Sequence, residues 1–460
     1  MIFVIAARSL GVENFGLFSS AIAIVGILSK FVDLGIEPIV FREFSKKDSS
    51  FHLFSTALTL RLLMYIVVVL LFNLSASIFE FTATEVILIN ILFLTIIFSA
   101  KTVVFRELLS TPFKAVLKMH YPMTVNVLDN LILLFFVIPM LYFDLGLIYF
   151  GSVYTLANFP GFLLMFIFLK RKFSYKIDFR LENAKWLIIE SLPMFGYVIL
   201  ITIFQQADVV ILNFLSGRED AGVYSVGLRL TMPLYIIPSA IVTTVFPTLV
   251  QQLEQKERSN FISNFVFKIL FFISFVLAIV FTFKAEQLVT LIWGTQYSQA
   301  AYASSILYWV QVFLFFNFFA IAVLIVHNRQ FYNFVYSLLL MGSNLLFAFM
   351  LIPDYGVNGA AIAKLTASVI AFSFIILSMS KLHIPLTFRP GMFAAWIILV
   401  SVALYLLAQM FSLVYYLSFA IIVIIIITFA VKFFLNEELF LFFKLLHKEE
   451  LGRRLLKINN

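Results

Sequence analysis

The chain has 460 residues, of which 63% are hydrophobic and only 12% are charged, and its formal net charge is +8 at pH 7. A soluble protein carries roughly 25% charged residues because water must solvate its surface, so this composition excludes a soluble globular protein and predicts a chain that faces lipid. The absence of cysteine excludes disulfides, thiolate metal sites and a cysteine nucleophile.

The N-terminus is a short apolar stub, Met1–Ala7, which ends at Arg8. It lacks the basic leader of a cleaved signal peptide, and it is too short to cross a bilayer, which takes about 20 residues. Thirteen long apolar segments follow it, and each predicts a membrane-spanning helix. They lie near Phe15–Val40, Leu53–Phe79, Glu85–Phe105, Tyr121–Phe143, Leu147–Leu169, Trp186–Leu215, Ala221–Val250, Phe261–Phe283, Ala300–Val326, Phe331–Ile352, Val357–Leu377, Met392–Phe411 and Tyr415–Phe434.

The loops between these segments alternate in charge. One set is rich in basic residues, and the opposite set holds only Arg8, Arg218 and Lys284 as basic residues, beside several acidic ones. Basic loops stay in the cytoplasm during insertion, so the basic set and the C-terminal tail are predicted to be cytoplasmic. Orientation and anionic headgroups therefore explain the net charge without a nucleic-acid partner.

Short motifs repeat along the chain at nearly constant distance. The sequence GVENFGLFS at residues 11–19 matches GREDAGVYS at residues 217–225, an offset of 206. Pro38 matches Pro247 at offset 209, and the Asp-Leu-Gly-Leu stretch from Asp144 matches the Asp-Tyr-Gly-Val stretch from Asp354 at offset 210. The chain is therefore predicted to contain two homologous six-helix lobes in the same orientation, an arrangement that places a substrate path between two halves.

This duplication predicts three regions and an incomplete beginning. The N-lobe covers residues 1–185, the C-lobe residues 186–380, and an extra helix pair with a basic tail residues 381–460. The C-lobe begins with a full span at Trp186–Leu215, whose counterpart would begin about 20 residues before Met1. We therefore expect the first helix to be truncated, through either a wrongly assigned start or a natural truncation of a fourteen-span ancestor.

Three stretches resemble the bacterial polysaccharide flippases of the Wzx type, in the multidrug/oligosaccharidyl-lipid/polysaccharide exporter superfamily. They are ARSLGVENFGLFSSA with DLGIEPIVFRE; SLPMFGYVILITIFQQADVVILNFLSGREDAGVYSVGLRL with a later FPTL; and TQYSQAAYASSIL with IPDYGVNGAAIAK. The resemblance covers essentially the whole chain except for the missing first helix. Its motifs are turn and packing patterns, which specify the superfamily better than the substrate.

The resemblance implies a transporter in the bacterial inner membrane that flips undecaprenyl-diphosphate-linked oligosaccharide by alternating access, for export of O-antigen, capsule or another polysaccharide. The implied partners are this lipid-linked oligosaccharide, membrane lipids, H⁺ or Na⁺ as coupling ion, and polysaccharide assembly proteins. No cofactor is implied.

Cations inside the spans are the candidate substrate-binding residues, because a charge at mid-bilayer normally faces a cavity or a partner. Lys30 and Arg61 are predicted nearer the cytoplasmic side, whereas Arg229 and Lys364 lie roughly 10 Å inside the outer side. Cations at two depths could pass a diphosphate across through charge-assisted hydrogen bonds. In the alternative interpretation Lys30 pairs with Asp33 on its own helix, and all four side chains reach toward headgroups.

Other polar residues inside the spans are weaker candidates. Asp208, with Gln205 and Gln206 beside it, could couple a proton or sodium ion or hold an interhelical hydrogen bond. Asp33 is a further candidate for a coupling or polar-cavity residue. The same alternatives apply to Asn126, Asp129 and Asn130, where a structural role is favoured. The five histidines form no metal-like cluster, and no glycine-rich phosphate loop indicates ATP hydrolysis.

Three functions compete with polysaccharide flipping. Within the superfamily, the chain could be a cation-coupled multidrug exporter or a flippase of the peptidoglycan precursor. The last helix pair, Met392–Phe434, exceeds the twelve spans expected of a drug exporter. A membrane glycosyltransferase or polymerase is disfavoured, because the outward loops are too short to hold a polar catalytic domain.

Overall fold

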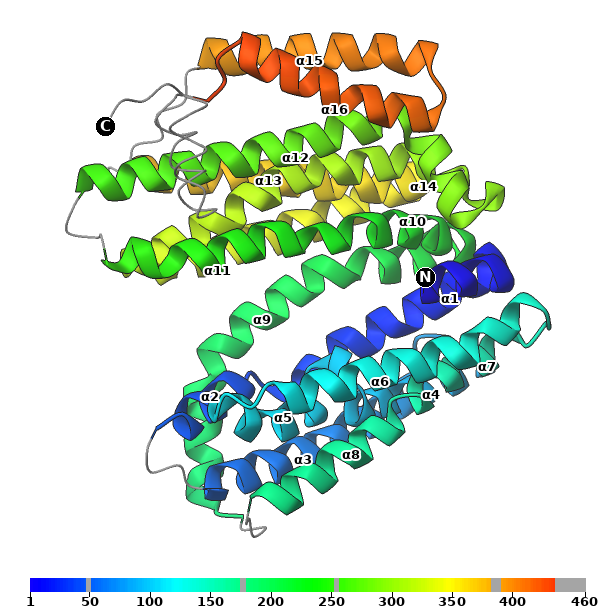
Figure 1. The fold of residues 1–460 in the computed structure, drawn as a ribbon. Coiled ribbons are helices and arrows are strands. Elements are labelled where there is room, and N and C mark those ends of the chain that lie inside the picture. The colour runs from blue at the N-terminus through cyan, green and yellow to red at the C-terminus, as the bar shows by residue number, and fades with distance from the viewer. Residues whose placement is uncertain (47–50, 174–178, 252–255, 382–389, 435–460) are drawn as a thin grey trace. The chain divides into compact units, whose positions relative to one another are not determined.

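The computed structural model describes residues 1–46, 51–173, 179–251, 256–381 and 390–434, and this part of the chain is helical without β-strands (Figure 1). The predicted basic tail lies outside the described residues. The helices are α1 (Ile2–Asp33), α2 (Glu37–Phe44), α3 (Phe51–Ser75), α4 (Ala83–Phe98), α5 (Phe105–Ala115), α6 (His120–Val137), α7 (Gly146–Leu156), α8 (Phe159–Lys172), α9 (Leu181–Leu215), α10 (Arg218–Thr231), α11 (Ile236–Gln251), α12 (Lys256–Trp293), α13 (Ala300–Val326), α14 (Gln330–Lys381), α15 (Pro390–Met410) and α16 (Leu413–Ala430).

The predicted all-α, multi-pass membrane architecture is confirmed. Eleven helical segments of the described chain are long and apolar enough to cross a membrane. The shorter apolar helix α4 is a twelfth segment, and the thirteenth arises because α14 contains two predicted spans that meet at Gly356, where the backbone leaves the helical region. The described helices therefore account for the thirteen predicted spans.

Several predicted boundaries were wrong because short turns interrupt apolar segments. The first predicted span runs to Val40, but α1 ends at Asp33, and Leu34 and Gly35 turn the chain with φ of 51° and 68°. Pro38 then lies in the first turn of α2, where its missing N–H costs nothing. The stub at the N-terminus is helical and continues into α1 through a non-helical Gly11.

Two further predicted spans are broken in the middle. The segment predicted at 85–105 ends as α4 at Phe98, and a 3₁₀ turn at Ala100–Thr102 separates it from α5. The segment predicted at 147–169 is divided into α7 and α8 next to Asn158 and Pro160. Such breaks at membrane depth free backbone groups, which must then find partners within the protein.

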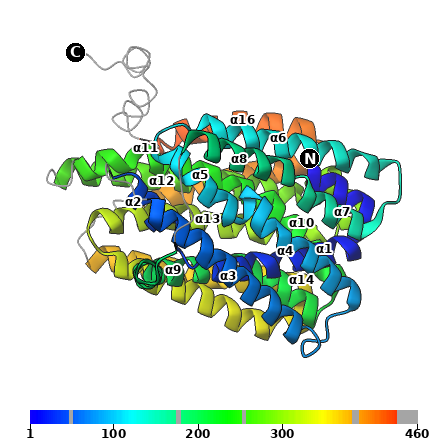
Figure 2. The same ribbon diagram turned by 90° about the horizontal axis from the view of Figure 1, so that it is seen from below.

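The chain divides into two compact units, each described here by itself. The first comprises Met1–Val226, Ile292–Tyr297 and Ser337–Ala363, and the second comprises the remaining segments. In the first unit α1 contacts α3, α4, α7 and α9, and Figure 2 shows α1, α4 and α7 near one another. At one end of this unit, α2, α3, α5, α6, α8 and α9 share an apolar core that includes Phe44, Phe54 and Phe113.

The second unit contains the last helix pair. Helices α15 and α16 pack on each other and share a core with α12 that includes Trp396, Val400 and Tyr416. The Tyr416 hydroxyl donates to the carbonyl of Val280 at 3.0 Å, and Trp396 Nε1 donates to Thr428 Oγ1 at 3.0 Å. These bonds satisfy the polar ends of aromatic side chains that carry large apolar areas into the packing.

The repeated motifs adopt matching backbone conformations. Gly11 and Gly217 have positive φ angles of 75° and 106°, and Gly146 and Gly356 have positive φ angles of 70° and 49°. Such angles favour glycine, which explains why glycine occupies both copies of each motif. The boundaries of the lobes at residues 185 and 380 stay a prediction.

Candidate functional site

Where the helix breaks after α4, backbone carbonyl oxygens accept hydrogen bonds from three cationic side chains. Lys30 Nζ donates to the Thr102 carbonyl at 3.3 Å, and Arg61 Nη1 donates to the Val104 carbonyl at 2.7 Å. Arg106 Nη1 donates to the Phe98 carbonyl at 3.3 Å. The break therefore turns unpaired backbone into a set of acceptors for positive charge within the spanning region.

Three of the predicted site residues, Lys30, Asp33 and Arg61, lie together in the first unit. Arg61 is fully buried and forms an ion pair with Asp33, which is itself 7% exposed. Lys30 is half-buried and lies close enough to both to interact with their charges. The pairing of Asp33 with Arg61, rather than with Lys30 alone, was not predicted, because it depends on the contact between α1 and α3.

A second buried ion pair, between α5 and α6, was not predicted from the sequence. Arg106 pairs with Asp129, and their exposed fractions are 1% and 4%. Arg106 Nη2 also donates to Asn126 Oδ1 at 3.3 Å. The pair explains why Asp129 is tolerated inside α6, as the structural interpretation of these polar residues predicts.

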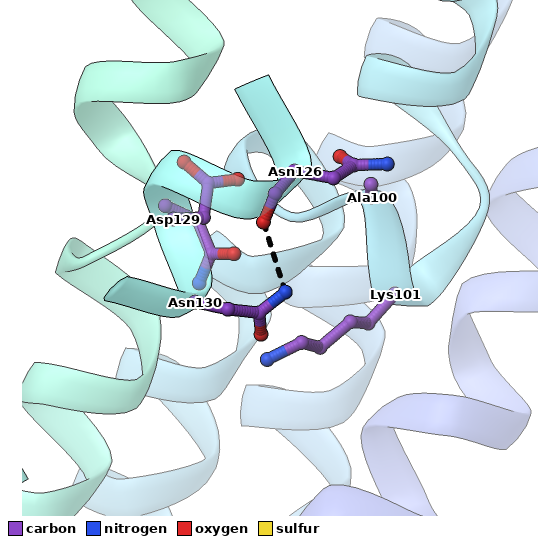
Figure 3. A pocket seen from close by; sticks show the side chains of 6 residues that line it. Ala100, Lys101, Asn126, Asp129 and Asn130 are labelled. Atoms are coloured by element: carbon purple, nitrogen blue, oxygen red, sulfur yellow. Dashed lines mark hydrogen bonds between the residues drawn. The ribbon is translucent and has the colours of Figure 1, made fainter. Parts of the chain in front are cut away.

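A small cavity of about 190 Å³ lies beside this pair in the first unit (Figure 3). Its lining residues are Ala100, Lys101, Asn126, Asp129, Asn130 and Asn158. Lys101 lies inside a predicted span, so reading every basic residue within the spans would have found it. Lys268 in α12 would have been found in the same way.

Asp208, a predicted coupling residue, is fully buried in α9 and accepts hydrogen bonds from side chains of two other helices. The Tyr224 hydroxyl donates to Oδ2 at 2.9 Å, and Asn344 Nδ2 donates to Oδ1 at 2.7 Å. All three residues belong to the first unit. Among the described residues there is no group of three or more histidine or acidic residues that could hold a metal ion.

The other predicted residues occupy separate places. Gln205 and Gln206 are half-buried in α9, and a Cβ on Gly26 of α1 would lie 3.9 Å from the Gln206 side chain. Arg229 lies in the last turn of α10 and is half-buried, whereas Lys364 lies in the second half of α14 and is 3% exposed. The last two belong to the second unit, so the four predicted cations do not form one cluster within a unit.

The two copies of the glycine motif, at residues 11–19 and 217–225, meet at the predicted outward end of the first unit. A Cβ on Gly16 would overlap the backbone of Arg218 and Gly222, and a Cβ on Gly222 would overlap the backbone of Val12 and Gly16. The residues Gly16 and Gly222 are equivalent at the offset of 206. The repeats are therefore in direct backbone contact, which only glycine permits.

An arginine crosses this contact. Arg218 at the start of α10 lies 3.7 Å from a Glu13 carboxylate oxygen and 3.5 Å from one of Glu85. Its Nη2 donates to Thr82 Oγ1 at 3.2 Å. Thr82 and Glu85 form the capping box of α4, so one side chain connects the starts of α4 and α10 with α1.

Comparison with known proteins decides the family. The family described as polysaccharide biosynthesis protein matches residues 1–253, more than half of the chain. The chain belongs to this family. The search of curated protein sequences found none that matches this chain.

Solved structures show which fold this member of the polysaccharide biosynthesis protein family adopts. It is similar to lipid II flippase MurJ in an inward closed conformation, with a TM-score of 0.73 and 14% identity over 97% of this chain and 96% of that one. It is also similar to an inward-facing multidrug resistance MATE family transporter of the MOP superfamily, with a TM-score of 0.64 and 15% identity over 83% of this chain and 94% of that one. A MOP superfamily transporter from Pyrococcus furiosus matches with a TM-score of 0.53 and 16% identity, over 83% of this chain and 91% of that one.

These similarities establish the fold of the superfamily that the sequence motifs indicated. Family and fold fit a multi-pass membrane transporter and give no reason to expect an enzyme.

Proposed function

We propose that the chain flips undecaprenyl-diphosphate-linked oligosaccharide across the bacterial inner membrane by alternating access, for export of a polysaccharide such as O-antigen or capsule. The observation that carries this proposal is the series of cations inside the spanning helices of a polysaccharide biosynthesis family member. Positive charge at this depth is expensive, so its retention favours an anionic cargo.

The cations lie at different depths, which suits a cargo that moves. Arg229 and Lys364 lie about 10 to 12 Å from the predicted outer ends of their spans, at 1.5 Å per residue. Lys30 and Arg61 lie nearer the predicted cytoplasmic ends, on carbonyls of the broken α4. A lipid diphosphate could therefore exchange one group of charge-assisted hydrogen bonds for another as the lobes rock.

The residues differ in how freely they can contact cargo. The guanidinium of Arg61 is fully buried and held by Asp33, which supports a role in positioning α3 and α4. Lys30 is half-buried and keeps a flexible stem, which suits direct contact. We therefore assign direct contact to Lys30 and Arg229, and positioning to Arg61 and Asp33. Lys364 is 3% exposed, so we assign its contact with cargo to another conformation of the transport cycle.

The carboxylate of Asp208 is the proposed coupling group, near Gln205 on the same helix. It accepts hydrogen bonds from Tyr224 and Asn344, which belong to different helices. Exchange of a proton or a sodium ion at this carboxylate would change the bonds that join α9 to α10 and α14. Coupling would thus act on contacts between helices.

Two alternatives remain within the superfamily. The structural similarity to lipid II flippase MurJ covers nearly the whole length of both chains and favours the peptidoglycan precursor as a second candidate cargo. The similarity to MATE family transporters, which includes 83% of this chain, supports the third candidate, a cation-coupled drug exporter. We favour the sugar cargo because of the family, and we place the C-terminus in the cytoplasm, where polysaccharide assembly proteins are the expected partners.

Removing the outer cations tests the proposal. In cells whose surface polysaccharide depends on this chain, Arg229→Ala and Lys364→Ala should each lower surface polysaccharide at least about tenfold, the loss expected for one charge-assisted hydrogen bond. Immunoblotting of membranes should show unchanged insertion. Lys268→Ala is the matched control, since it removes a buried lysine whose ammonium lies over the rings of Phe433 and Phe434. Wild-type polysaccharide in both outer variants would refute their assignment.

A further inference from the structure

The cavity beside α6 lies between the two breaks in the predicted spans and is lined by charged and amide side chains. Asp129 follows the start of α6 by nine residues, which places it about 13 Å along the helix. The hydrocarbon core is about 30 Å thick, so the cavity is predicted to lie inside it, in the cytoplasmic half. Both helix breaks lie beside it, since Ala100 and Lys101 belong to the break after α4 and Asn158 to the break between α7 and α8.

Three of the six lining residues are asparagines. Asn130 Nδ2 donates to the Asn126 carbonyl at 2.8 Å, and Asn158 Nδ2 donates to the Tyr154 carbonyl at 2.8 Å. Asn126 accepts from Arg106 through Oδ1. These bonds fix each amide by one end and leave its other end without a partner among the described residues. Amides that offer both donors and acceptors suit sugar hydroxyl groups, which also do both.

The charges around the cavity do not balance. Asp129 is paired with Arg106, so these two charges neutralise each other. The ammonium of Lys101 has no hydrogen bond or ion pair among the described residues; it lies over the ring of Tyr154, 5.0 Å from the ring centre, within electrostatic range of both Asp129 and Arg106. Figure 3 shows Lys101 and Asn130 extending into the same space. One positive charge at this depth is therefore left for a ligand to neutralise.

We propose that this cavity binds one acidic sugar residue of the transported oligosaccharide, with its carboxylate on Lys101 and its hydroxyl groups on Asn126, Asn130 and Asn158. The inference rests on the proposed function and names the class of sugar. The volume of about 190 Å³ equals roughly six waters at 30 Å³ each, which is room for one sugar residue. Pockets for drug-sized ligands are larger, about 300–1,000 Å³.

A diphosphate fits this cavity less well than a carboxylate. A diphosphate carries at least two negative charges in adjacent groups. The cavity offers only one unbalanced cation, because Arg106 is already paired with Asp129. A monoanionic group matches the charge that is left. The diphosphate is thereby assigned to the cations outside the cavity.

The test uses two synthetic undecaprenyl-diphosphate disaccharides that differ in one sugar, glucose or glucuronic acid. The full chain is reconstituted in liposomes, and movement of each lipid between leaflets is measured against protein-free liposomes. The glucuronyl lipid should move about ten times faster or more than the glucosyl lipid, the effect of one hydrogen bond to a charged group. Lys101→Gln should reduce its rate to that of the glucosyl lipid, whereas Lys101→Arg should keep the preference.

Lys268→Gln is the matched control and should also keep the preference, since it neutralises a buried lysine of another helix. Equal rates for both lipids in the wild type, or an unchanged preference in Lys101→Gln, would overturn the inference while leaving flipping intact. If neither lipid moves, flipping of such lipids is refuted, and a binding measurement then decides about the cavity.

Binding is measured on the purified full chain by thermal unfolding with sodium glucuronate, glucose or glucose 1-phosphate at equal ionic strength. Stabilisation by glucuronate that disappears in Lys101→Gln supports the inference. Stabilisation by glucose 1-phosphate alone would assign the cavity to a phosphate and overturn the carboxylate. The absence of any Lys101-dependent shift would overturn the site itself.

Discussion

Arg61 and Arg106 are two buried guanidinium groups that depend on the same broken helix. Each pairs with one aspartate and also takes a carbonyl that the interruption of α4 leaves exposed. A buried charge is tolerated only while its partners stay in place, so the loss of one partner is more costly than the loss of both.

Asp33→Asn should destabilise the protein strongly, because it leaves the fully buried Arg61 without its counter-charge. The expected loss in free energy of unfolding is about 3–5 kcal/mol. The double variant Asp33→Leu with Arg61→Met should recover most of it. Denaturant unfolding in detergent micelles measures both, and a double variant as unstable as the single one would contradict the argument.

The same variants separate two roles of Arg61. Since the proposed role is positioning, the double variant should keep most of the transport rate in liposomes, whereas direct contact with the diphosphate requires a large loss.

Sequence reasoning found Lys30, Asp33 and Asp208 as polar residues in apolar segments, and the structure gives each a partner. It missed Lys101 and Arg106 for different reasons. Lys101 lies inside a predicted span and could have been identified from the sequence. Arg106 lies just beyond the predicted end of that span, and it is buried because α5 packs against α4, α6 and α8. A pairing between separate helices has no signal in one sequence.

At the scale of elements, hydropathy predicted the spans but not their interruptions. An average over about 20 residues barely changes when six of them, Ser99–Val104, form a turn inside an apolar segment. Repeated glycines were more informative. Their recurrence at a fixed offset identified Gly16 and Gly222, although their mutual contact requires the folded positions of α1 and α10.

That contact yields a prediction for α1 and α10. Gly16→Ala should separate the two helices at the predicted outward end, because its Cβ would overlap backbone atoms, which cannot move aside as a flexible side chain can. The chain lacks cysteine, so Ser20→Cys gives a single reporter, and Ser20 is 2% exposed without a hydrogen bond to its hydroxyl among the described residues. Labelling of this cysteine by a membrane-impermeant maleimide should rise several-fold.

Gly342→Ala is the control for this substitution. It adds the same methyl group to another helical glycine, where nothing lies within 4 Å of the new Cβ. Its labelling should equal that of the reporter alone. Equal labelling in Gly16→Ala would show that the outward ends of α1 and α10 do not depend on their close approach.

For the whole molecule, the proposed alternating access requires that the predicted outward ends of the helices close firmly enough to seal and weakly enough to open. Two kinds of contact act there. The glycine contact is steric and independent of salt, whereas Arg218 joins α1, α4 and α10 through charges at 3.5 and 3.7 Å that are partly exposed. Exposed ion pairs contribute about 0–1 kcal/mol each, so they adjust the closed population without fixing it.

Arg218→Ala should therefore raise labelling of the Ser20→Cys reporter by about fivefold or less, the factor that corresponds to about 1 kcal/mol. One molar salt should have a similar effect on the unsubstituted reporter, because the Debye length falls to about 3 Å and screens both glutamates. Salt should then add nothing in Arg218→Ala, because this variant has already lost the attraction between Arg218 and the two glutamates. Salt should still act on top of Gly16→Ala, where these ion pairs can form. A salt response that persists undiminished in Arg218→Ala would mean that charges other than Glu13 and Glu85 hold the outward end closed.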